Sequence, residues 1–160
     1  MIIVSDTTPI NYLILIDQIH LLRDLYGQVV LPQAVFDEMQ SASAPDKVRA
    51  WISNRPEWLE LRTVSMPDST LNLGAGEKEA ITLAREMRAD LLLMDDKKGR
   101  RAAQERGLTV IGTLAVLATA ARREMVNLPA AIEHLKQTNF RAPSDLMRSL
   151  LDEEYTPDRK

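Results

Sequence analysis

The chain of 160 residues has the length of one domain, and its 45% hydrophobic and 27% charged residues are typical of a globular protein. The net charge of −3 excludes a general surface attraction for nucleic acid, so a polyanion would have to be bound locally. The absence of cysteine excludes disulfides, thiolate metal sites and thiol catalysis, and it fits a reducing cytoplasm.

The first apolar run is interrupted by Asp6, and no stretch approaches the about 18 apolar residues that span a bilayer. We therefore expect no signal peptide, no membrane contact and a cytoplasmic protein. In the first half of the chain, residues 2–4 predict a strand, and Thr8 and Pro9 suit the start of a helix. The patterns then predict helical segments at 10–16 and 19–26, a strand at 29–31, helices at 32–40 and around 48–52, and an edge strand at 58–64.

The second half repeats the alternation after a loop at 65–76. The patterns predict a helix at 77–87, a strand at 91–95, a helix at 100–106, a strand at 108–111, and helices at 114–125, 129–137 and 143–154. Alternating strands and helices favour a parallel sheet covered on both faces. The predicted fold class is α/β, a three-layer α/β/α sandwich around a mainly parallel five-stranded sheet. Residues 1–154 form one predicted domain, followed by a tail at 155–160.

Acidic residues stand at strand ends and helix starts in four parts of the sequence: Asp6, Glu38, Glu77 and the pair Asp95/Asp96. Ligands of open parallel sheets bind beyond the carboxyl ends of the strands, near the point where strand order reverses. Carboxylates that meet there repel one another, so such a cluster normally contains a cation. Oxygen ligands suit Mg²⁺ or Mn²⁺, which can promote attack on a phosphodiester. We therefore predict a metal site.

A basic run follows the acidic pair directly, and it consists of Lys97, Lys98, Arg100 and Arg101. Two interpretations stay open for these residues: contact with substrate phosphates at a helix N-terminus, or a solvated helix face.

Four sequence pieces, in order, resemble the PIN domain: IIVSDTTPI, VVLPQAVFDEM, GAGEKEAITLA and LLLMDDKKGRRAA. The sequence is most similar to a compact prokaryotic branch of that superfamily, related to VapC-type toxins, and the likeness extends through IGTLAVLATAARREMV.

The resemblance implies an α/β/α fold with a catalytic set of Asp6, Glu38, Glu77 and Asp96 around Mg²⁺ or Mn²⁺, and with Asp95 as a further ligand. It implies RNA as substrate, contacted by Thr8 and the basic run, and the activity of a metal-dependent endoribonuclease. It also implies the toxin role in a type II toxin–antitoxin pair, with a small antitoxin protein as partner and a homodimeric assembly.

Other nucleotide and phosphate folds match less well. The turn at Gly74–Gly76 lacks both a preceding strand and the third glycine of a dinucleotide fingerprint, and no Walker A loop is present. The alternative that stays open is a catalytically inactive PIN-like scaffold that binds RNA or a protein partner.

Overall fold

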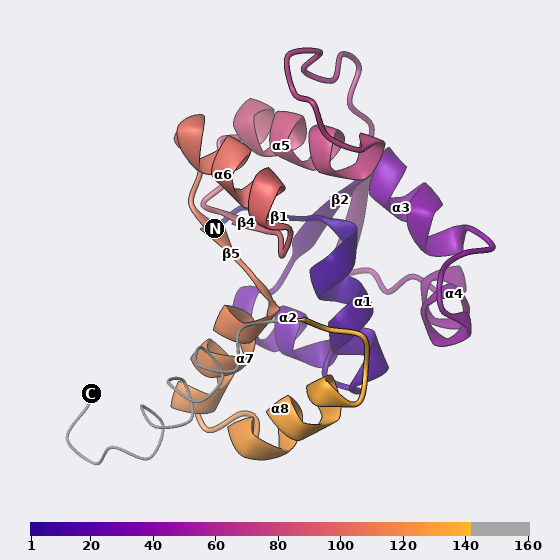
Figure 1. Ribbon diagram of the computed structural model, residues 1–160, viewed down its shortest axis with the longest axis vertical. Coiled ribbons are helices and arrows are strands. Elements are labelled where there is room, and N and C mark those ends of the chain that lie inside the picture. The colour runs from indigo at the N-terminus through magenta and orange to yellow at the C-terminus, as the bar shows by residue number, and fades with distance from the viewer. Residues whose placement is uncertain (142–160) are drawn as a thin grey trace.

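The computed structural model describes residues 1–141 and places five strands in one parallel sheet (Figure 1). The strands are β1 (Ile3–Ser5), β2 (Val29–Pro32), β3 (Leu59–Arg62), β4 (Leu91–Leu93) and β5 (Val110–Ile111). Their order across the sheet is β3-β2-β1-β4-β5, and each neighbouring pair is parallel. The predicted fold class is confirmed, and the strand expected at an edge, β3, is an edge strand.

Helices connect the strands and continue beyond β5. They are α1 (Thr7–Leu15), α2 (His20–Tyr26), α3 (Gln33–Gln40), α4 (Asp46–Ser53), α5 (Ala75–Met87), α6 (Lys97–Glu105), α7 (Thr113–Arg122) and α8 (Leu128–Lys136). None of the helices among residues 1–141 is both long and apolar enough to cross a membrane.

The sheet separates two apolar cores, because successive side chains of a strand point to opposite faces. Ile3 of β1 belongs to the larger core, which also takes side chains from α1, α2, α3, α4, α7 and α8. Val4, the next residue, belongs to a smaller core with α5 and α6. Figure 1 shows α5 and α6 on one side of the sheet and α1, α2, α7 and α8 on the other. The three layers are therefore helix, sheet and helix.

The order of the strands reverses between β1 and β4. From β1 the chain moves to β2 and β3 on one side, and it later adds β4 and β5 on the other. Ser5 pairs with Leu93, and the Asp6 backbone N–H donates to the Leu93 carbonyl at 2.9 Å. The residues after β1 and β4 consequently lie side by side at the carboxyl edge of the sheet, where open α/β sheets bind ligands.

Three predicted boundaries are wrong in ways that affect the site. The first helix begins at Thr7 with Asp6 as its N-cap, two residues earlier than a Thr8 cap would give. Strand β4 ends at Leu93, so both acids of the pair lie in the connection to α6. Helix α6 begins at Lys97, which brings the whole basic run into the helix. The helix predicted at 143–154 and the tail lie outside the described residues.

Candidate active site

Asp6 is the most buried acid of the site, with only 3% of its surface exposed. Burial raises the pKa of this carboxyl to about 7, although the Thr7 N–H lowers it. The charges of Glu77, Glu38 and Asp95 raise the pKa further, because each disfavours a second negative charge nearby. Side chains that are distant in sequence therefore lie close enough to Asp6 to act on its ionisation.

Glu38 on α3 is held by two other helices. The Thr7 hydroxyl on α1 donates to its Oε2 at 2.6 Å, and the Gly76 N–H on α5 donates to Oε1 at 3.1 Å. A Cβ on Gly76 would stand 2.5 Å from that same Oε1, so the close approach requires glycine at this position. The starts of α1 and α5 thus fix the Glu38 carboxylate beside Asp6.

Glu77 and Asp96 meet over the first turn of α6. A Cβ built on Gly99 would lie 3.5 Å from both the Glu77 Oε2 and the Asp96 Oδ2. Burial raises the pKa of Glu77, the charges of Asp96 and Glu38 raise it further, and Lys98 lowers it. Asp96 is the N-cap of α6, since its Oδ2 accepts the Gly99 N–H at 2.8 Å.

Asp95 has different partners from its neighbour Asp96. Its Oδ1 accepts the Thr113 N–H at 2.8 Å, and its Oδ2 accepts the Thr113 hydroxyl at 2.6 Å. Burial raises the pKa of Asp95, while the Thr113 hydrogen bonds and then the charge of Arg100 lower it. The two adjacent carboxylates therefore contact different helices: Asp96 bonds the first turn of α6, and Asp95 bonds the first residue of α7.

The sequence matches the family model described as DUF3368, PIN domain, over residues 2–154. The chain belongs to the PIN domain family. Members of this family are generally nucleases, and they typically use divalent metal ions. No curated protein matches the chain.

Among solved structures, this PIN domain is similar to a PilT N-terminus domain protein from the hyperthermophilic archaeon Sulfolobus solfataricus P2. The two share 23% sequence identity with a TM-score of 0.56, over 75% of this chain and 93% of the other. This likeness supports the fold.

The donor chemistry of the acidic site fits the divalent ion that PIN domains typically use. Asp6, Glu38, Glu77 and Asp96 offer only hard carboxylate oxygens, which suit Mg²⁺ or Mn²⁺ better than softer metals. Within residues 1–141, no three Asp, Glu, His or Cys side chains lie close enough together to coordinate one metal ion. Glu38 and Asp96 instead accept hydrogen bonds from the backbone N–H groups of Gly76 and Gly99.

One more oxygen lies on the α1 side of this PIN domain. The Oδ1 of Asn11 is buried and has no hydrogen-bond partner within residues 1–141. Asn11 follows Thr7 by one helical turn, on the same face of α1. A buried amide oxygen without a partner costs free energy, so it is available to a water molecule or a ligand.

We expect Glu77, rather than Glu79, to bind metal on α5. Two residues apart on a helix, they point about 200° from each other, and the Glu79 Oε1 accepts the Ala34 N–H at 3.0 Å, at the start of α3. Glu77→Gln should therefore abolish Mn²⁺ binding measured by calorimetry. Glu79→Gln is the matched control, because a glutamine oxygen can keep the bond to Ala34. Loss of Mn²⁺ binding in Glu79→Gln but not in Glu77→Gln would show that the Glu79 side of α5 faces the metal.

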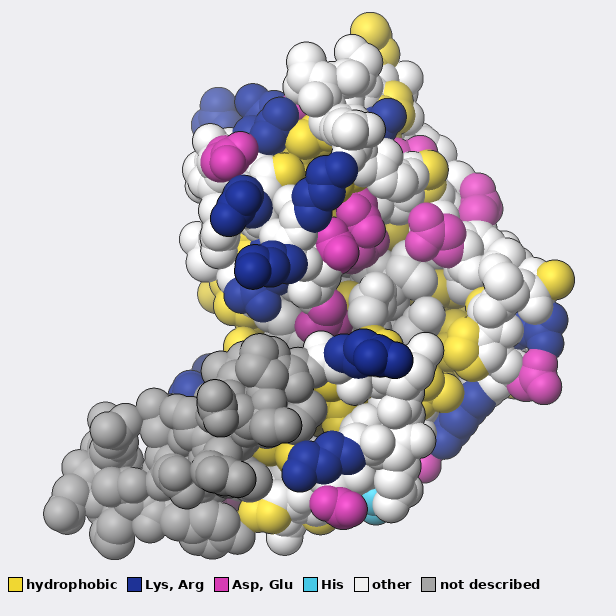
Figure 2. Space-filling view, viewed as in Figure 1, with side chains coloured by type: hydrophobic (Ala, Val, Ile, Leu, Met, Phe, Trp, Pro, Cys, Tyr) yellow, Lys and Arg dark blue, Asp and Glu magenta, His cyan; other side chains and the backbone are white. Residues whose placement is uncertain are grey.

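The basic residues predicted to contact substrate separate into two positions. Lys97, Arg100 and Arg101 line a cavity of about 290 Å³ beside Asp95. Lys98 lies nearer the acids, because its charge acts on Glu77. Figure 2 shows Lys and Arg side chains gathered over α6, next to acidic side chains.

Thr8 is partly buried, and its hydroxyl makes no hydrogen bond within the described residues. Thr7 holds the site acid instead. The contact predicted for Thr8 with substrate stays a prediction.

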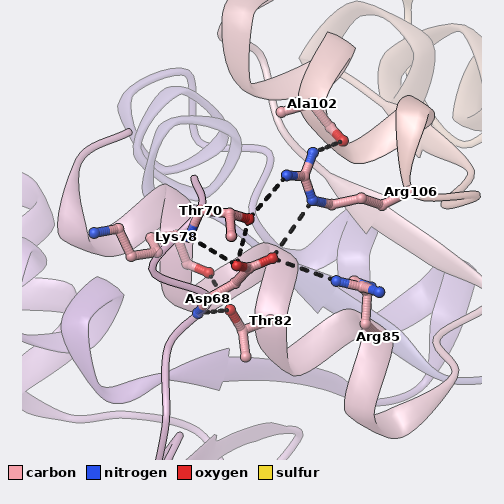
Figure 3. Close-up of polar contacts among 7 residues, drawn as sticks. All are labelled: Asp68, Thr70, Lys78, Thr82, Arg85, Ala102 and Arg106. Carbon is pink, nitrogen blue, oxygen red and sulfur yellow. Dashed lines mark hydrogen bonds and ion pairs between the residues drawn. The ribbon is translucent and has the colours of Figure 1, made fainter. Parts of the chain in front are cut away.

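A polar cluster fixes the loop that leads into α5 (Figure 3). Asp68 accepts from the Thr70 N–H and hydroxyl at 2.9 and 2.6 Å. Its other oxygen lies 3.4 Å from Arg85 on α5 and 3.5 Å from Arg106, the C-cap of α6. The Asp68 N–H donates to the Thr82 hydroxyl at 2.9 Å. These contacts connect the loop to both helices that carry Glu77 and the basic run, so the cluster sets their spacing.

We expect Asp68→Asn to lower the melting temperature at pH 7. The Thr70 hydrogen bonds, followed by Arg106, lower the pKa of Asp68. A carboxylate with a lowered folded pKa stabilises above its unfolded pKa, and that stability is lost as pH falls through the folded value. The gap between variant and wild type should therefore close below about pH 4.

Melting curves across pH test this, with Asp46→Asn as the control. Asp46 forms an exposed ion pair with Arg49 one turn away, and such pairs contribute little to stability. A gap for Asp68→Asn that is independent of pH would show that its charge is not what fixes the loop.

Proposed function

We propose that the protein is a metal-dependent endoribonuclease that hydrolyses RNA phosphodiester bonds. The observation that carries the proposal is the gathering of Asp6, Glu38, Glu77 and Asp96 at the point where the strand order reverses. The mutual effects on the pKa values of Asp6 and Glu77 reflect that proximity. Acids that meet at one sheet edge repel one another, which a bound cation would relieve, and PIN domains are generally nucleases.

In this proposal the four acids bind Mg²⁺ or Mn²⁺, and Asp95 is a further metal ligand. The bound ion supplies Lewis-acid polarisation of the phosphodiester and offsets the charge that develops on it. Asp6, with a pKa of about 7, must release its proton for the site to load. The Thr7 hydroxyl and the backbone N–H groups of Gly76 and Gly99 hold Glu38 and Asp96 at this edge of the sheet.

We further propose that this ribonuclease is the toxin of a type II toxin–antitoxin pair and acts in the cytoplasm as a homodimer. These parts of the proposal rest on the resemblance to VapC-type toxins. Co-expression with a small DNA-binding protein encoded in the adjacent reading frame tests the pairing. Growth arrest by the chain alone, relieved by the partner, is the expected result, and light scattering of the purified chain tests the dimer.

A second candidate function is a PIN scaffold that binds RNA or a protein without cutting. It is favoured by the hydrogen bonds that already occupy Glu38 and Asp96. The deciding experiment is cleavage of single-stranded RNA by wild type and Asp6→Asn in Mn²⁺ and in chelator. The ribonuclease proposal expects cleavage only by wild type with metal. Binding without cleavage under every condition would support the scaffold.

A further inference from the structure

A basic cavity lies on the side of α6, next to the acidic site. Lys97, Arg100, Arg101 and Gln104 line it together with Asp95, and its volume is about 290 Å³. On a helix that begins at Lys97, residues at these spacings share one face, so the three cations converge. Lys98 is outside this group and lies toward Glu77.

The cations of this cavity form no ion pair among residues 1–141, although the charge of Arg100 acts on Asp95. None of the ion pairs in that part of the chain includes Lys97, Arg100 or Arg101. Three cations that line one open cavity repel one another, and an anion bound there would relieve that repulsion.

The position of Arg100 is set by the backbone beneath it. A Cβ on Gly112 would stand 2.6 Å from the Asp95 Oδ1 and 3.3 Å from the Arg100 Nη1, so glycine leaves room for both groups. Thr113 holds the Asp95 carboxylate with two hydrogen bonds, which fixes the base of the cavity. Arg100 is therefore placed by Asp95 without a close ion pair, and its planar donor group stays available for a ligand.

We propose that this cavity binds a single phosphate group of the nucleic-acid substrate, held jointly by Lys97, Arg100 and Arg101 and oriented by the Gln104 amide. Three cations around one carboxylate leave a net positive charge that suits a phosphate. The guanidinium groups can form paired hydrogen bonds with its oxygens. The inference rests on the proposed function only in taking a nucleic acid as the ligand, and it assigns Lys98 to the acidic site.

The phosphate has two possible sources, an internal diester or a terminal monoester of the strand. The probe is a short fluorescent single-stranded RNA, prepared with 5′-phosphate, 3′-phosphate or only hydroxyl ends. Binding is measured by anisotropy in chelator, so the result does not depend on whether the protein cleaves RNA. The variants are Arg100→Gln, Arg101→Gln and the double variant. Lys136→Gln is the matched control, with the same charge change on α8, far from α6 (Figure 1).

If Arg100 and Arg101 bind the same phosphate, the losses of RNA affinity in the single variants should not add up in the double variant. Each single variant should weaken binding by about tenfold, and the double variant should lose little more, because both act on the same contact. The slope of log K against log salt should fall by about 0.7 in every one of these variants, the value for one phosphate of a single strand. Lys136→Gln should leave affinity and slope unchanged.

Several outcomes separate the possibilities. Tighter binding of an RNA with a phosphorylated end supports the cavity with the terminal monoester as its ligand. Equal affinity for all ends, with the non-additive losses kept, supports it with an internal diester. Additive losses, with a salt slope that falls twice as far in the double variant, would overturn it in favour of separate contacts on an open helix face. Unchanged binding in all variants would also overturn it.

Discussion

Asp6→Asn is expected to abolish RNA cleavage and, at the same time, to stabilise the metal-free protein. Turnover should fall by at least about 100-fold, because the substitution removes a central carboxylate of the metal site. The free energy of unfolding at pH 7 in chelator should rise by a few kcal/mol, because asparagine has nearly the same shape without a charge. Most buried substitutions destabilise, so a gain would be diagnostic.

The stabilisation should depend on pH with a definite sign. The folded pKa of Asp6 is about 7, against 3.8 for the ordinary carboxyl. Between these values the unfolded chain is ionised while the folded chain keeps its proton, so wild type loses stability as pH rises from about 4 to 7. The advantage of Asp6→Asn should therefore be absent near pH 4 and complete near pH 8. Denaturant unfolding at several pH values measures it. An advantage that does not change with pH would show that packing, not charge, is responsible.

The adjacent acids Asp95 and Asp96 should respond in opposite ways to the same substitution. Asp96→Asn should keep its cap on α6, because asparagine is as good an N-cap as aspartate, while turnover falls by roughly 100-fold or more. Asp95→Asn should destabilise the fold by about 1–3 kcal/mol, because an NH₂ group would replace one of two oxygens that accept from Thr113. Its remaining turnover, measured well below the melting temperature, should exceed that of Asp96→Asn.

Thermal melts and RNA cleavage assays on the two variants make the comparison. Thr113→Val is a useful companion to Asp95→Asn, because it removes the hydroxyl partner and leaves the acid in place. Equal loss of turnover at both positions, with equal stability of both variants, would show that Asp95 and Asp96 have the same role in the site.

The strand pattern allowed most of the fold to be predicted. Apolar runs that end at Asp6 and Pro32 indicate where β1 and β2 stop, and alternation with helices indicates a parallel sheet. The proximity of Asp6 and Asp95 also followed, since strand ends of a parallel sheet share one edge. Burial of Asp6 is the structural consequence that raises its pKa.

The partners of the acids could not be predicted, because they depend on strand order and on helix starts. Asp95 and Thr113 are 18 residues apart and meet because β4 and β5 are neighbours. Thr7, instead of Thr8, reaches Glu38 because Asp6 caps α1 and so sets which side of the helix faces α3. A shift of one residue at a helix start rotates every side chain by about 100°.

The same reason explains why the directions of the basic side chains could not be predicted from sequence. Four cations in five residues indicate a basic surface, but their directions depend on where α6 begins. Starting at Lys97, the helix turns Lys98 toward Glu77 and the other three toward the cavity. Gly76 and Gly112 were not identified as site residues either, because their importance lies in the carboxylates that pack against them.

The most direct test of the central claim, that the acids form one cation site, is thermal unfolding in chelator and in rising Mn²⁺. Wild type, Asp6→Asn, Asp96→Asn and Glu79→Gln are compared. In chelator, Asp6→Asn and Asp96→Asn should melt above wild type, because each removes one of several crowded charges. Mn²⁺ should stabilise wild type and Glu79→Gln by about 2.7 kcal/mol at 100 times the dissociation constant, and it should leave the two aspartate variants nearly unchanged. Equal gains in all four proteins, with both aspartate variants melting below wild type in chelator, would contradict the claim.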